Sequence, residues 1–137
     1  MKKLIIASAI ALAATGASAQ VKVGVILGFT GPLESITPGM ADSAELAFKE
    51  ASDSGLLLGG QKIEAIRGDS TCTDSAAASA AAERLITSDG VVAIMGADCS
   101  GVTTAIANNV AVPKGVVMVS PSATSPALTT IKDNGYF

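Results

Sequence analysis

Four short apolar segments along the chain alternate with longer segments in which apolar residues recur at helical spacing. Valine and isoleucine dominate the short segments, which predicts β-strands at 21–27, 63–67, 91–95 and 116–120. Amphipathic or alanine-rich patterns predict helices at 40–54, 75–88 and 102–110. Glycine and proline gather in the connecting loops, most densely at 28–39 (GFTGPLESITPG).

Polar residues mark the ends of these predicted elements. Asp74 precedes the helix at 75–88 and is expected to cap it, and Gly90 follows its end. Ser100 is expected to cap the next helix in the same way. Asp69 and Asp98 also lie near strand ends, where we interpret them as turn and cap residues.

The alternation of strands and helices predicts an α/β fold. Strands that are apolar on both faces belong to a parallel sheet that helices cover on both sides. Right-handed crossovers leave few strand orders for such a sheet, and we predict the doubly wound order 2-1-3-4. No linker or internal repeat divides the sequence from residue 20 onward.

The first residues are predicted to lie outside this fold. Two lysines precede an apolar run at 4–13, and residues 17–19 (ASA) form an A-x-A cleavage site. This is the pattern of a secretory signal peptide. We therefore expect 1–19 to be removed by cleavage after Ala19, which leaves an exported domain that begins at Gln20. The alternative interpretation is a buried N-terminal helix.

Export changes the interpretation of the two cysteines. Cys72 and Cys99 form an even pair in a chain bound for an oxidising compartment, which favours a disulfide. Two free thiols or a metal pair are the alternatives. The metal pair is disfavoured because the chain has no histidine, and two cysteines alone leave a zinc shell half empty.

Composition excludes several classes of function. The chain of 137 residues has a net charge of −3 and no cluster of basic residues, so we expect no nucleic-acid partner. The absence of histidine removes Ser-His-Asp, Cys-His and His-metal mechanisms from this chain. The G-x-S-x-G, Walker A and dinucleotide-binding patterns are also missing. We therefore expect no catalysis, no cofactor and no metal.

Small and hydroxyl residues follow three of the predicted strands. The loops at 28–39, 96–101 and 120–126 leave the carboxyl ends of the first, third and fourth strands, where open parallel sheets bind ligands. A helix N-terminus with the hydroxyls of Ser100 and Thr124 suits a carboxylate. In the alternative interpretation, Ser100 only caps its helix and Thr124 only shapes a turn.

Several motifs together resemble a known family. After the signal peptide come a strand followed by G-x-x-G-P, then D-S-x-C, then G-A-x-C-S-G at 96–101, and V-S-P-S-A-T-S-P-A-L-T at 119–129. In this order they resemble the periplasmic branched-chain amino-acid-binding proteins, the leucine/isoleucine/valine-type receptors of ABC importers. The resemblance spans 21–137 and implies a type I periplasmic-binding-protein lobe.

The resemblance also implies roles for individual residues. Ser100 matches the serine that receives the ligand α-carboxylate, and Thr124 matches a threonine that contacts the amino-acid head group. Ser122 matches the residue whose backbone carbonyl accepts the α-ammonium, and Ala123 lies with them in the ligand-binding loop. Ile36 occupies a position where the family often has an aromatic side chain over the ligand. Cys72 and Cys99 match the family's disulfide pair.

Members of this family are two-lobed clamps that close on their ligand by a hinge. The resemblance therefore implies that 20–137 is an incomplete N-terminal lobe, whose missing partner lobe completes the site. It implies a periplasmic and monomeric receptor that binds a branched-chain or other aliphatic amino acid and delivers it to a membrane permease.

Two other functions stay open at this level. The first is a ligand-sensing regulatory module of the same fold that binds an amide, urea-like or aromatic-acid ligand. The second is an exported α/β enzyme whose catalytic base lies outside this sequence.

Overall fold

The computed structural model describes residues 20–137, and the predicted signal peptide at 1–19 lies outside them. The main elements alternate as predicted, in the order β1 (Val21–Leu27), α1 (Thr37–Asp53), β2 (Ile63–Asp69), α2 (Ser75–Thr87), β3 (Ala93–Gly96), α3 (Ser100–Ile106) and β4 (Val117–Val119). A π-helical turn (Ala107–Ala111) and α4 (Val112–Lys114) continue α3. Two short 3₁₀ turns, η1 (Leu57–Gly59) and η3 (Pro126–Thr130), complete the described chain.

The strands form one parallel sheet in the order β2-β1-β3-β4. This confirms the predicted α/β class and doubly wound order. Because β1 lies inside the sheet, the loops after β1 and β3 leave neighbouring strands on the same carboxyl edge, where ligands bind in such folds.

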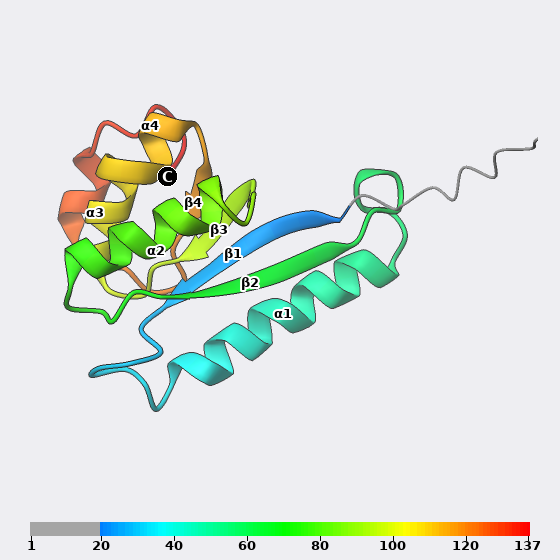
Figure 1. Cartoon of the computed structure of the whole chain (residues 1–137), viewed down its shortest axis with the longest axis horizontal. Helices are drawn as coiled ribbons and strands as arrows, with labels where there is room; N and C mark the ends of the chain where they lie inside the picture. Colours follow the sequence, from blue (N-terminus) through cyan, green and yellow to red (C-terminus); the bar gives the residue numbers. More distant parts are fainter. Residues whose placement is uncertain (1–19) are drawn as a thin grey trace, which may run out of the picture.

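Helices lie on both faces of the sheet. Figure 1 shows α1 along one side of the β1–β2 pair, with α2 and α3 on the other side. On the α2 side, the buried core joins Ile26 and Ile94 to apolar residues of α2, α3 and β4. On the α1 side, a smaller core contains Val25, Leu27 and Ala41.

Leu85 of α2 packs against the sheet where two strands have glycine. A Cβ atom at Gly68 of β2 would lie 3.0 Å from a Leu85 methyl carbon, and one at Gly24 of β1 would lie 3.2 Å from the same carbon. The two glycines therefore form a shallow groove that admits the Leu85 side chain, which is 0% exposed.

The α1 side of the sheet is only partly covered. Val117 and Val119 of β4 are 46% and 63% exposed, whereas Met118 between them is 1% exposed. The register aligns Val119 with Met95 and Met95 with Val25, so these residues share the face that α1 covers over β1 and β2. Helices thus lie on both sides of the sheet as predicted, but within residues 20–137 none covers the α1 side at β4.

Several element boundaries differ from the predicted ones. Helix α1 begins at Thr37 rather than residue 40, because Pro38 fits the first turn of a helix, where its missing N–H is not needed. The helix after β3 runs on to Lys114 rather than ending at 110, with its π-helical turn immediately before the segment that contains Pro113. Asp74 caps α2 as predicted, since its side chain accepts hydrogen bonds from the Ala76 and Ala77 amides.

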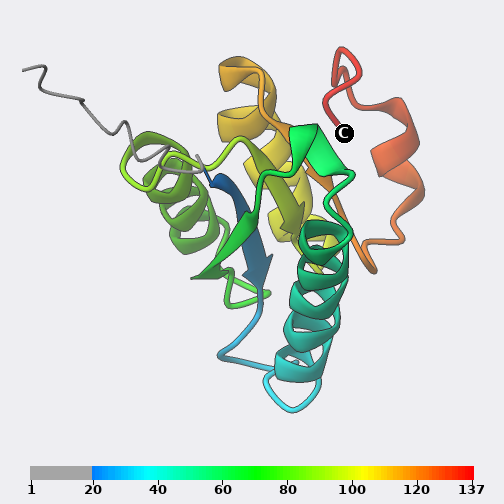
Figure 2. The same ribbon diagram turned by 90° about the vertical axis from the view of Figure 1, so that its right-hand side faces the viewer.

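The C-terminal segment lies beside β4. Figure 2 shows it leaving the carboxyl end of β4 and folding back along the outer side of the sheet. There the Met118 amide donates to the Tyr136 carbonyl oxygen at 2.7 Å. Within residues 20–137, no helix is long and apolar enough to cross a membrane.

Leu85→Ala tests the packing of α2 on the sheet. The substitution leaves a cavity over Gly24 and Gly68, and we expect it to lower the free energy of unfolding by about 2–5 kcal/mol. Urea unfolding followed by circular dichroism measures the loss. Leu46→Ala is the matched control because Leu46 of α1 is 57% exposed, and we expect its effect to stay within about 0.5 kcal/mol. Equal losses in the two variants would contradict the packing described above.

Candidate functional site

A disulfide joins two of the loops at the carboxyl edge of the sheet. Cys72 follows β2 and Cys99 immediately precedes α3, and their sulfur atoms are bonded with the Cα atoms 5.2 Å apart. Thr71 and Cys72 both have left-handed backbone conformations, which are uncommon for residues with side chains. The bond therefore holds a strained loop against the start of α3.

Ser100 connects the start of α3 to the loop after β4. Its Oγ accepts hydrogen bonds from the backbone amides of Thr124 at 3.0 Å and Ser125 at 3.1 Å. The N-cap of α3 is Cys99, and Ser100 is the first helical residue, so the prediction that Ser100 caps its helix is wrong. Its hydroxyl bonds the neighbouring loop instead, and no described residue accepts the Ser100 hydroxyl proton.

The loop after β4 is held by two further serines. Ser122 Oγ donates to the Asp98 carbonyl oxygen at 2.9 Å. Ser120 Oγ donates to the Ala97 carbonyl oxygen and accepts from the Ala123 amide at 2.8 Å. The sequence analysis does not identify Ser120 as a residue that holds this loop. Its position offers a signal, because a polar residue ends an apolar strand there and a proline follows it.

The structure brings four of the five predicted ligand-binding residues together. Ser122, Ala123 and Thr124 form one short loop that is bonded to Ser100 and its neighbours. Ile36 belongs to a different loop, at the N-cap of α1 after β1, and is 55% exposed. The Thr124 hydroxyl has no hydrogen bond to a described residue, and the residue is exposed.

The loop after β1 is fastened to β2 through Asp69. The Asp69 carboxylate accepts from the Thr30 hydroxyl at 2.6 Å, from the Thr30 amide at 3.3 Å and from the Thr71 amide at 2.8 Å. Burial acts to raise the pKa of Asp69, but these hydrogen bonds to the ionised form outweigh it and lower the pKa below the usual 3.8. Asp69 is thus the turn residue that the sequence predicts.

Arg67 supports the same loop from β2. Its guanidinium bonds Glu45 and Asp42 of α1 at 2.6 Å each, and it lies 5.5 Å from the centre of the Phe29 ring. The bond to Glu45, followed by that to Asp42, raises the pKa of Arg67. The charged groups of both ion pairs are partly or largely exposed, so water screens them and the pairs contribute little to the stability of the fold. The contact of Arg67 with the loop is the one to the Phe29 ring.

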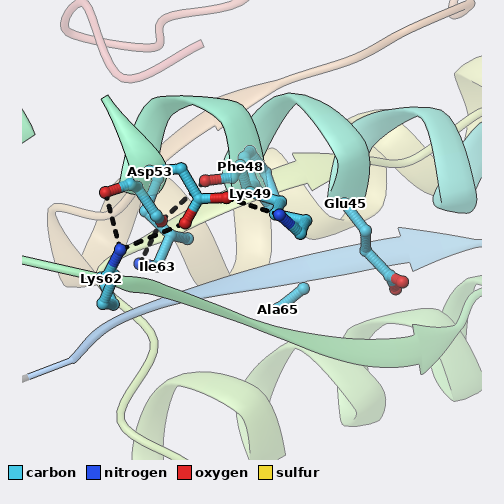
Figure 3. A pocket seen from close by; sticks show the side chains of 8 residues that line it. Glu45, Phe48, Lys49, Asp53, Lys62, Ile63 and Ala65 are labelled. Carbon is cyan, nitrogen blue, oxygen red and sulfur yellow. Dashed lines mark hydrogen bonds and ion pairs between the residues drawn. The ribbon is translucent and has the colours of Figure 1, made fainter. Parts of the chain in front are cut away.

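A cavity of about 400 Å³ lies elsewhere, between the second half of α1 and the start of β2. Figure 3 shows Lys49 and Lys62 directed toward Asp53 across it, and both lysines form ion pairs with that carboxylate. The two lysines and Asp53 therefore satisfy one another, while Glu45 pairs with Arg67 outside the lining. The cavity lies away from Ser100 and Thr124. Its lining residues are Glu45, Phe48, Lys49, Ser52, Asp53, Lys62, Ile63 and Ala65.

Residues 20–137 contain no cluster of three or more His, Cys, Asp or Glu side chains that could hold a metal ion. The carboxyl edge instead presents hydroxyls, backbone amides and the first turn of α3. Such groups bind a carboxylate or another small anion by hydrogen bonding, without a cationic side chain.

The effect of pH on the Asp69 contacts provides a test of this loop. Because the pKa of Asp69 is lower in the folded chain, its ionised form contributes stability above the ordinary value of 3.8, and this contribution is lost as the pH falls through the lower folded value. We expect the parent to lose more unfolding free energy than Asp69→Asn between about pH 5 and pH 2. Urea unfolding at each pH measures this.

Glu34→Gln is the matched control for that experiment. Glu34 is an exposed carboxylate in the same loop with no ion pair or side-chain hydrogen bond to a described residue. The control should keep the pH dependence of the parent. An Asp69→Asn variant with the parent's pH dependence would show that Asp69 does not fasten the loop.

The described chain matches a protein family over its full length. The family described as "Periplasmic binding protein" matches residues 20–137, which is the whole of the described chain.

Curated relatives are named as amino-acid-binding proteins. The leucine-specific-binding protein of Salmonella typhimurium is 33% identical over 93% of this chain and 34% of its own length. The Leu/Ile/Val-binding protein of Escherichia coli K12 is 30% identical over 93% of this chain and 34% of its own length. The chain therefore spans about a third of the length of these relatives.

Solved structures share the fold. The branched-chain amino acid transporter substrate binding protein LivJ from Streptococcus pneumoniae, in complex with isoleucine, has a TM-score of 0.72 and 32% identity over 81% of this chain and 31% of its own. A solute binding protein from Rhodopseudomonas palustris BisB5, in complex with 3,4-dihydroxybenzoic acid, has a TM-score of 0.69. It is 26% identical, and the match covers 80% of this chain and 29% of that protein.

The resemblance deduced from the motifs is thus confirmed at the level of the family. The match covers all four strands and the loops that contain Cys72, Ser100 and Thr124. These relatives are named as binding proteins rather than enzymes. The chain belongs to the periplasmic binding protein family.

Proposed function

We propose that this chain forms one wall of a ligand cleft in the solute receptor of an ABC importer, and that the ligand is a branched-chain or other aliphatic amino acid. The observation that carries the proposal is the environment of Ser100. Its Oγ accepts two backbone amides from the loop after β4, while its own proton has no acceptor within the described chain. That proton is available to a ligand carboxylate.

Neighbouring groups complete a site for an amino-acid head group. The exposed Thr124 hydroxyl lies next to the amide that Ser100 binds. The first backbone amides of α3 have no hydrogen-bond acceptor inside the helix. They therefore offer donors and a partial positive charge to the ligand carboxylate. The backbone carbonyl of Ser122 is the proposed acceptor for the α-ammonium group, and Ile36 is proposed to border the ligand from the loop after β1.

The rest of the receptor is proposed to lie outside this chain. In this proposal residues 20–137 are most of an N-terminal lobe, and a second lobe closes on the ligand and supplies the acidic partner of the ammonium group. The permease of an importer then receives the ligand from a monomeric receptor. The names and lengths of the relatives support this arrangement.

Substitution of the two hydroxyl residues tests the site. In the complete gene product we expect Ser100→Ala and Thr124→Ala each to weaken the binding of L-leucine by about tenfold or more, because each variant loses a hydrogen bond to a charged group. Isothermal titration calorimetry measures the affinity. Unaltered affinity in both variants would remove these residues from the site.

Two controls match these variants. Ser79 of α2 donates to the Ser75 carbonyl oxygen, and Thr129 donates to the Pro126 carbonyl oxygen, so both are local helix contacts away from the proposed ligand. Ser79→Ala and Thr129→Ala should bind L-leucine as the parent does.

Titration with 4-hydroxybenzoate tests the alternative ligand class, and tighter binding of that acid than of L-leucine would replace the amino acid in the proposal.

The proposed periplasmic location has its own test. If residues 1–19 are a signal peptide, the exported protein begins at Gln20. Intact-mass spectrometry of protein released from the periplasm should give the mass that corresponds to this start. A substitution of both Lys2 and Lys3 by glutamate should reduce export. Periplasmic protein that still begins at Met1 would contradict cleavage.

A further inference from the structure

Asp98 is a buried carboxylate that the proposed ligand site does not use. It follows β3 and is only 3% exposed. Within residues 20–137, no lysine or arginine forms an ion pair with it. A buried carboxylate costs free energy unless hydrogen bonds replace the water it has lost. Its role therefore depends on the groups that donate to it.

Those donors come from the ends of two other strands. The Gly28 amide, at the end of β1, lies 3.2 Å from Oδ1 and 3.1 Å from Oδ2 of Asp98. The Ser70 hydroxyl, which follows β2, donates to Oδ1 at 3.2 Å. A Cβ at residue 28 would lie 3.2 Å from Oδ2, so the glycine admits the carboxylate to the β1 backbone.

The backbone of the same residue reaches the fourth strand. The Asp98 carbonyl oxygen accepts from Ser122 Oγ at 2.9 Å. Side chain and backbone together thus connect Asp98 to the loops after β1, β2 and β4, and Asp98 itself lies in the loop after β3. The next residues along the chain are Cys99, bonded to Cys72, and then Ser100.

We propose that Asp98 is the positioning residue of the ligand site, which sets the loops after β1 and β4 at fixed places on either side of Ser100. This inference rests on the proposed function, because it names the group that orders the same site. Asp98 does not contact the ligand. It acts through the Gly28 amide and through Ser122.

Asp98→Ala and Asp98→Asn distinguish positioning from a general contribution to stability. The alanine removes every acceptor for Gly28 and Ser70, whereas the asparagine oxygen still accepts the Gly28 amide. In the complete gene product we expect Asp98→Ala to weaken L-leucine binding by about tenfold. Asp98→Asn should recover most of that loss. Calorimetry is performed at a temperature at which circular dichroism shows every variant to be folded.

Ser52→Ala is the matched control. Ser52 of α1 is also buried, at 5% exposure, and its hydroxyl accepts from the Ile63 amide at 2.9 Å. Ile63 begins β2, so this contact lies at the opposite end of that strand from Ser70. The control should lower the melting temperature while its affinity for L-leucine stays within about twofold of the parent. An Asp98→Ala variant that is destabilised and binds L-leucine as the parent does would overturn the proposal.

A readout without ligand separates this inference from the proposed function. Amide hydrogen exchange by NMR should be about tenfold faster at Gly28 and Thr124 in Asp98→Ala, and unchanged at both in Ser52→Ala. If the parent does not bind L-leucine, the proposed function fails, and faster exchange at both amides still supports the positioning role. Unchanged exchange at these amides overturns the positioning role.

If Asp98→Ala does not fold, Ser70→Ala is used in its place, and its increase in amide exchange should be smaller than that expected for Asp98→Ala.

Discussion

Three consecutive residues of β1, from Val25 to Leu27, have no exposed surface. Alternating side chains of a strand point to opposite faces, so this burial requires an apolar layer on each side of the sheet and a strand on each edge of β1. Parallel strands on both edges of β1 require crossover connections, and the helices in those crossovers supply the apolar layers on the two faces. The same crossovers place the loops after every strand at one carboxyl edge, where Ser100, Ser122 and Thr124 lie. The site thus follows from the burial of a single strand.

Hydroxyls, backbone groups and the carboxylates of Asp69 and Asp98 hold the loops at that edge. Serine and threonine side chains connect neighbouring loops, while the charged groups near Arg67 and Asp53 lie exposed on the α1 side. In the proposed function this arrangement serves the ligand carboxylate, because a fixed array of amides and hydroxyls binds a carboxylate without a cationic side chain.

Periodicity and composition predict the strands, their order and the cap at Asp74, because each of these depends on neighbouring residues or on general rules of chain crossing. Features that depend on distant residues were not predictable. Besides a ligand contact, the sequence predicts a helix cap at Ser100, but its partners lie 24 and 25 positions away. The sequence predicts a turn or cap residue at Asp98, but its donors follow β1 and β2. Val119 follows the apolar pattern of a buried strand, yet no helix within residues 20–137 covers it.

The strand order also has a consequence for how the chain folds. The first of the described strands to be synthesised, β1, is an inner strand of the sheet, and its partners follow much later: Val21 pairs with Ile63 and Val23 with Ala93. Until both arrive, the uncharged sequence from Val23 to Leu27 has two open edges and two apolar faces. Long-range parallel pairing of this kind is slow and leaves aggregation-prone intermediates. A chain built in this order benefits from being kept unfolded until β3 is complete.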